Sequence, residues 1–172
     1  GYSFGSGVTI PGTGILLDNQ MNNFAYQYGN PEVIDRSASI GNRFEPGKRP
    51  MSTMTPIIVF DENNALKLIT GSPGGALIPA ALMRVVTGVI DFDLGVGEAT
   101  MLPRLHKDWP YKNLRLEKGF SKDTLQILES YGHELEESKT MGSTQSILIS
   151  AKGKEGFADL RRPNAGVAIQ LD

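Results

Sequence analysis

The stretch Thr70-Gly71-Ser72-Pro73-Gly74-Gly75, followed directly by the apolar segment Ala76–Ile90, decides the fold. A β-prone run over 66–70 precedes the glycines, and apolar residues recur at helical spacing after them. Glycine pairs allow a sharp backbone bend, and Pro79 is compatible only with the first turn of a helix. The stretch therefore predicts a strand, a tight turn, and a helix that begins close to the glycines.

The N–H groups of such a turn have no partners inside the helix, and they lie at the positive end of its dipole. The turn can hold a phosphate, a carboxylate or the oxyanion of an acyl-transfer intermediate. A strand-to-helix connection that binds nothing is the alternative. The sequence has no G-x-x-x-x-G-K-[ST], no G-x-G-x-x-G and no G-x-S-x-G, so neither a nucleotide-binding loop nor a nucleophile elbow is indicated.

Length and composition favour one globular domain over residues 1–172, because 172 residues with 40% apolar and 21% charged content can bury a core. A formal charge of −2 gives no electrostatic case for nucleic acid or an anionic membrane. The short basic groups at 152–154 and at Arg161-Arg162 are predicted to be solvated surface. The absence of cysteine excludes disulfides and thiol chemistry, and neither His106 nor His133 belongs to a metal-binding pattern.

The remaining elements predict an α+β protein in which helices cover an antiparallel sheet. A buried strand is expected at 14–17, an Asx-rich turn at 18–24, and a hairpin from 57–60 and 66–70. The loop at 26–50 is long enough to be a lid or to be disordered. A short helix is expected at 94–99 and another at 122–131 with Ser121 as its N-cap. Further strands are predicted at 114–117, 134–137, 146–150, 156–158 and 166–170.

Four motifs, spaced along the chain, resemble the small subunit of gamma-glutamyltranspeptidases, and the resemblance extends from Phe4 to Pro163. Four motifs in the same order are far more specific than any one of them. They are Gly14-Ile-Leu-Leu-Asp-Asn-Gln-Met-Asn-Asn-Phe24, Lys48-Arg-Pro-Met-Ser-Thr-Met-Thr-Pro56, Thr70-Gly-Ser-Pro-Gly-Gly75 and Met141-Gly-Ser-Thr-Gln-Ser-Ile147.

The resemblance implies an N-terminal nucleophile hydrolase, a four-layer αββα sandwich made when a precursor cleaves itself into a large and a small subunit. In this family the nucleophile is the new N-terminal threonine, with its own α-amine as base. That threonine lies upstream of the position that matches Gly1, so this chain is expected to need both that segment and the large subunit for activity. Periplasmic or extracellular location follows from the resemblance, and no cofactor or metal is implied.

The resemblance also assigns roles to individual residues. Gly74 and Gly75 match the pair whose N–H groups form the oxyanion hole, which agrees with the dipole argument. Ser52 and Thr53 match two hydroxyl residues that hold the α-carboxylate of the substrate. The family commonly has two serines there, so Thr53 departs mildly from its pattern.

Gln20 and Asn23 match residues near the α-amino group of the donor. Asn23 stands where gamma-glutamyl enzymes usually have an aspartate, and an amide does not require a cation as its partner. Family members with asparagine here resemble cephalosporin acylases, which accept glutaryl groups. A glutaryl amidase is therefore the alternative within this enzyme class, and a non-catalytic anion-binding module is the alternative outside it.

Overall fold

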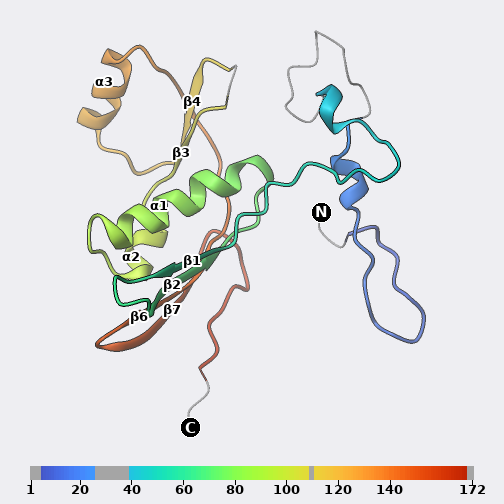
Figure 1. Cartoon of the computed structure of the whole chain (residues 1–172). Helices are drawn as coiled ribbons and strands as arrows, with labels where there is room; N and C mark the ends of the chain where they lie inside the picture. Colours follow the sequence, from blue (N-terminus) through green and yellow to red (C-terminus); the bar gives the residue numbers. More distant parts are fainter. Residues whose placement is uncertain (1–4, 26–38, 109–110, 170–172) are drawn as a thin grey trace. The chain divides into compact units, whose positions relative to one another are not determined.

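The computed structural model describes residues 5–25, 39–108 and 111–169, and these form two compact units, Gly1–Ser52 and Thr53–Asp172 (Figure 1). The described residues of the first unit include the 3-10 helices η1 (Gln20–Asn23) and η3 (Ile40–Asn42). The second contains two sheets and three α-helices. Each unit is described by itself.

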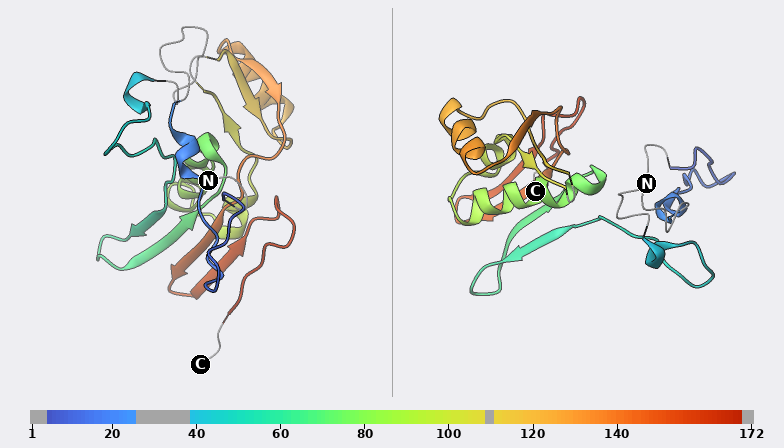
Figure 2. Two further views of the ribbon diagram at one scale, coloured as in Figure 1. Left: turned by 90° about the vertical axis from the view of Figure 1, so that its right-hand side faces the viewer. Right: turned by 90° about the horizontal axis from the view of Figure 1, so that it is seen from above.

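A four-stranded antiparallel sheet is the centre of the second unit, with the strand order β1-β2-β6-β7 (Figure 2). Its strands are β1 (Ile57–Phe60), β2 (Leu66–Gly71), β6 (Gln145–Ser150) and β7 (Gly153–Ala158). The predicted hairpin of β1 and β2 is confirmed. The Asp61 carboxylate closes its turn by accepting from Asn63 N at 2.9 Å and from Ala65 N at 2.8 Å.

Helices α1 (Ile78–Ile90) and α2 (Val96–Met101) cover one face of this sheet. The core between these layers consists of Leu68, Val85, Val89, Val96 and Ala99. The opposite face carries the cross-strand row of Ile58, Ile69 and Ile147, of which Ile58 and Ile147 are exposed. One helix layer on one sheet corresponds to half of the sandwich that the resemblance implies.

The second sheet has the order β3-β4-β5, from β3 (Leu105–His106), β4 (Asn113–Leu116) and β5 (Glu134–Glu137). The predicted antiparallel sheet does not extend to this one, because β4 and β5 pair in parallel. Parallel neighbours require a crossover, and helix α3 (Lys122–Ser130) lies within it. Ser121 caps α3 as predicted, with its Oγ accepting from Thr124 N at 3.1 Å.

Several predictions near the ends of the chain differ from the structure. The stretch 14–17 is not a buried strand: it forms an exposed ribbon in which Leu16 pairs with Thr9, and Ile15 is 58% exposed. Residues 166–169 have no regular structure. In the predicted loop 26–50, residues 26–38 lie outside the described part of the chain, and η3 lies within the rest. The Asx-rich turn is confirmed, since the Asp18 carboxylate accepts from Gln20 N at the start of η1.

Candidate functional site

The glycine turn joins β2 to α1 through a short 3-10 helix, η4 (Gly75–Leu77). Gly74 has φ 144° and ψ 9°, and Gly75 has φ 58°. Backbone at these positive φ values is open to glycine and costly for residues with a Cβ. Pro79 lies in the first turn of α1, where its missing N–H costs nothing. The predicted turn and helix start are therefore confirmed.

The N–H groups of Gly74 and Gly75 are available to a ligand. Both residues are exposed, and within the described chain neither amide donates to another group. The Gly74 carbonyl, in contrast, accepts from Leu77 N at 3.1 Å and so begins the helical ladder. Two free donors at the start of a helical segment favour a negatively charged partner.

The loop Met141–Thr144 holds this turn from behind. The Ser72 Oγ accepts from Ser143 N at 3.0 Å and donates to Pro73 O at 2.7 Å. Gly142 has φ 70°, and a Cβ there would lie 2.8 Å from Ser72 Oγ. A Cβ on Gly74 would lie 3.3 Å from the Gly142 Cα. The two loops therefore pack backbone against backbone, and both contacts depend on glycine.

A buried ion pair anchors that loop in turn. The Arg104 and Asp159 side chains are 1% and 0% exposed, and Arg104 Nη2 lies 2.7 Å from Asp159 Oδ2. Arg104 Nη1 donates to Met141 O at 2.6 Å, and Asp159 Oδ2 accepts from Thr144 N at 2.9 Å. The pair therefore holds both ends of the loop behind the glycine turn.

A second buried pair extends this network. Arg161 Nη2 lies 2.7 Å from Glu117 Oε2, and Arg161 Nη1 lies 3.2 Å from Asp159 Oδ1. The Glu117 carboxylate also accepts a hydrogen bond from Met141 N. The prediction that Arg161 belongs to the solvated surface is wrong, because its side chain is 8% exposed. Arg162, Lys152 and Lys154 are exposed as predicted.

The environment of Asp159 makes the fold sensitive to acid. Burial acts to raise the pKa of Asp159, but the backbone N–H groups of Arg161 and Thr144 and the Arg104 guanidinium outweigh it and hold the pKa below its ordinary value. The ionised carboxylate therefore stabilises the fold above the unfolded-state pKa of about 3.9. This stabilisation is lost as the pH falls through the lower, folded-state pKa.

We therefore expect the difference in unfolding free energy between the wild type and Asp159→Asn to shrink in acid. Urea unfolding of both proteins from neutral pH to below about 3.9 measures it. Other carboxyl groups titrate in both proteins, so the difference isolates Asp159. A difference that stays constant across this range would contradict the assigned pKa direction.

The predicted substrate-binding residues divide between the two units. Gln20 and Asn23 share η1 in the first unit, and the Asn23 Nδ2 donates to Met51 O at 3.2 Å, which brings Asn23 beside the residue that precedes Ser52. Ser52 is exposed and ends this unit. Thr53 is half-buried, and it belongs to the second unit with the glycine turn.

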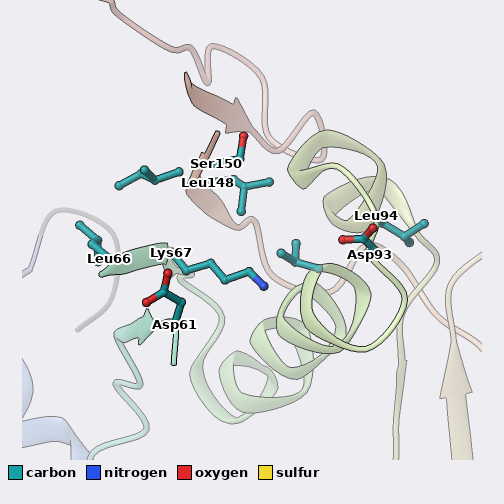
Figure 3. Close-up of a pocket in the computed structure, with 9 residues that line it drawn as sticks. Asp61, Leu66, Lys67, Asp93, Leu94, Leu148 and Ser150 are labelled. Atoms are coloured by element: carbon teal, nitrogen blue, oxygen red, sulfur yellow. The ribbon is translucent and has the colours of Figure 1, made fainter. Parts of the chain in front are cut away.

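A pocket of about 340 Å³ in the described part of the chain is lined by none of the six predicted site residues (Figure 3). Leu66, Leu94 and Leu148 form its apolar wall, and Lys67 extends from β2 across it toward α1. It lies where β2 begins and α1 ends, whereas the glycine turn lies where β2 ends and α1 begins.

The described residues hold neither a candidate metal site nor a helix suited to a membrane. No group of three or more His, Asp or Glu side chains is arranged to hold a metal ion there. None of the helices in this part of the chain combines the length and apolarity that a membrane span requires.

Comparison with known proteins covers nearly the whole chain. A sequence model of the gamma-glutamyltranspeptidase family matches residues 1–169. The glutathione hydrolase proenzyme of Escherichia coli is 43% identical over 152 residues, which are 88% of this chain and 26% of that protein. The chain spans between a quarter and a third of the length of the curated relatives it matches.

Solved structures agree with the sequence comparison. A mutant gamma-glutamyltranspeptidase of Helicobacter pylori aligns with a TM-score of 0.80 and 36% identity, over 94% of this chain and 89% of that chain. The cephalosporin acylase of Bacillus halodurans aligns with a TM-score of 0.76 and 28% identity, over 98% of this chain and 30% of that one. The predicted α+β class is confirmed, and the chain belongs to the gamma-glutamyltranspeptidase family.

Proposed function

We propose that this chain is part of the small subunit of an autoprocessed enzyme that transfers or hydrolyses gamma-glutamyl groups from amides such as glutathione. Its partner is the large subunit of the same precursor, and the enzyme acts in the periplasm or outside the cell. Family membership and relatives named glutathione hydrolase proenzymes support this proposal. We further propose that the two units together make up one domain of that larger hydrolase, over residues 1–172.

The N–H groups of Gly74 and Gly75 form the oxyanion hole of the proposed reaction. A threonine supplied from outside this chain attacks the gamma-carbonyl, its hydroxyl proton passes to its own α-amine, and negative charge develops on the carbonyl oxygen. The C–N bond then breaks, the amine leaves with that proton, and water or an amino acid accepts the acyl group. The observation that carries the proposal is the pair of exposed amides without acceptors.

The remaining predicted residues bind the donor. Ser52 and Thr53 hold its α-carboxylate through their hydroxyl groups. Gln20 and Asn23 lie near its α-amino group. The Asn23 Oδ1 accepts a hydrogen bond from the ammonium, which can only donate, while the Asn23 Nδ2 donates to Met51 O.

Two measurements test the proposed function on the full-length protein. Mass spectrometry is expected to find a precursor cut immediately before a threonine upstream of Gly1, and the processed enzyme is expected to hydrolyse a gamma-glutamyl anilide. An uncut, inactive protein that binds nucleotides tightly by calorimetry would instead support an anion-binding module.

A glutaryl amidase is the second candidate, and Asn23 is the residue that favours it. An ammonium that pairs with a neutral amide instead of a buried carboxylate loses about 2–5 kcal/mol of binding. The structural similarity to the Bacillus halodurans cephalosporin acylase is consistent with this candidate. We therefore expect kcat/KM for gamma-glutamyl anilide to exceed that for glutaryl anilide by less than about a thousandfold, ~4 kcal/mol.

Asn23→Asp is expected to raise this preference for the gamma-glutamyl donor by at least about tenfold, because a carboxylate attracts the α-ammonium. Asn22→Asp, which adds the same charge to the same 3-10 helix, is the matched control and is expected to leave the ratio unchanged. A wild-type preference above a thousandfold, or equal effects of the two variants, would refute the role of Asn23.

A further inference from the structure

Asn42 is a buried polar residue that no sequence pattern singled out. It ends η3 and is 8% exposed. Its side-chain Nδ2 donates to Asn23 O at 2.7 Å, and its Oδ1 accepts from Met51 N at 2.8 Å. Its carbonyl accepts from Ala25 N at 2.9 Å. One amide therefore joins two segments that are far from each other in the sequence.

These contacts close a ring with Asn23. The Asn23 side chain donates to Met51 O, the Met51 N–H donates to the Asn42 side chain, and the Asn42 side chain donates back to the Asn23 carbonyl. Beside the ring, Phe24 and Phe44 pack edge to face with ring centroids 5.2 Å apart, and Phe24 is 3% exposed. Asn42 is therefore the buried member of this ring, beside the half-buried Asn23 and the exposed Met51, and an unmade hydrogen bond at its amide is costly.

The two segments joined by Asn42 carry the groups assigned to opposite ends of the donor. Asn23 is assigned to the α-amino group, and Met51 directly precedes Ser52, which is assigned to the α-carboxylate. The amino and carboxylate groups share one carbon atom, so their two binding groups must be held at a fixed spacing. A change in this spacing weakens the contacts with both groups at once, and the loss falls on binding of the donor.

We propose that Asn42 is a positioning residue that sets the spacing between Asn23 and Ser52 and thereby the affinity for the α-amino acid end of the donor. To join the Asn23 carbonyl and the Met51 N–H, a side chain of this length needs both an N–H donor and an oxygen acceptor, and the asparagine amide supplies both. An ionised aspartate of the same shape can accept from Met51 N, but it places a negative charge against the Asn23 carbonyl. The inference rests on the proposed function, and Asn42 itself contacts no substrate.

Asn42→Asp in the full-length enzyme tests this inference. We expect KM for gamma-glutamyl anilide to rise by about tenfold or more while kcat changes by less than about threefold, because binding is lost and the acyl-transfer groups are retained. KM for glutaryl anilide, which lacks the α-amino group, is expected to rise less. Asn63→Asp, an exposed residue of the β1–β2 turn, is the matched control and is expected to change neither constant.

A second variant and a melting curve separate positioning from folding. Asn42→Ser keeps a hydroxyl but is too short to reach both segments, so it is expected to shift KM in the same direction. Unchanged KM in either variant, a fall in kcat alone, or loss of the folded protein in both variants would overturn the inference. Wild-type hydrolysis of gamma-glutamyl anilide tests the proposed function alone, and the ratio of variant to wild-type KM tests only Asn42.

Discussion

Asp159→Ala is expected to destabilise the enzyme by about 3–5 kcal/mol, because it leaves the Arg104 guanidinium buried without its counter-ion. The Arg104 side chain is 1% exposed, so bulk water does not reach the guanidinium to compensate for the lost carboxylate as it would at the surface. The variant also removes the acceptor of Thr144 N and of Arg161 N. Urea unfolding of the full-length enzyme measures the loss, and a parallel fall in activity is expected because the loop behind the glycine turn loses its anchor.

An exposed ion pair in the same chain provides the control. Lys118 Nζ lies 3.4 Å from Glu137 Oε1, with side chains 81% and 69% exposed. Pairs of this kind contribute about 0–1 kcal/mol, so Glu137→Ala is expected to be nearly silent. Comparable small effects of both variants would show that the Arg104–Asp159 pair does not stabilise the fold.

Local signals explain which parts of the fold could be predicted. The β1–β2 hairpin, the start of α1 and the Ser121 cap each depend on residues within a few positions of one another. The pairing of Arg104 with Asp159 joins residues 55 positions apart, and no periodicity encodes it. For the same reason Arg161 could not be distinguished from the exposed Arg162 beside it.

The candidate site was predictable to a similar extent. The glycine turn carries its own signal, because a strand, two glycines and an apolar helix follow one another directly. The apolar residues at 14–17 predicted a buried strand, but these residues are exposed. Burial requires other elements to pack over a segment, and the local sequence does not specify which elements do so. Asn42 belongs to a Gly-Asn pair within the predicted loop, but no local signal marks its contacts, because its partners Asn23 and Met51 are 19 and 9 positions away.

Gly74→Ala is expected to lower kcat by about 100- to 1000-fold, the usual effect of losing one oxyanion-hole donor. At φ 144° an alanine is strained, and its Cβ would lie 3.3 Å from the Gly142 Cα, which is backbone and cannot rotate away. The turn must therefore shift, and the N–H that we propose as an oxyanion-hole donor shifts with it. Steady-state kinetics with gamma-glutamyl anilide measures the effect, and KM is expected to change little.

Two neighbouring glycines supply the matched controls for this prediction. Gly75 has φ 58°, and a Cβ there meets nothing within 4 Å, so Gly75→Ala is expected to cost about 1–2 kcal/mol of stability while its N–H keeps its direction. A Cβ on Gly71 also meets nothing, and its φ is not in the left-handed region, so Gly71→Ala is expected to keep kcat. If Gly74→Ala kept wild-type kcat and stability, the amides of this turn could not be the groups that stabilise the oxyanion. A fall in kcat confined to Gly74→Ala, with all three variants processed and folded, would support a role for that amide in the chemistry, because only at Gly74 does the added methyl group lie within 4 Å of neighbouring backbone.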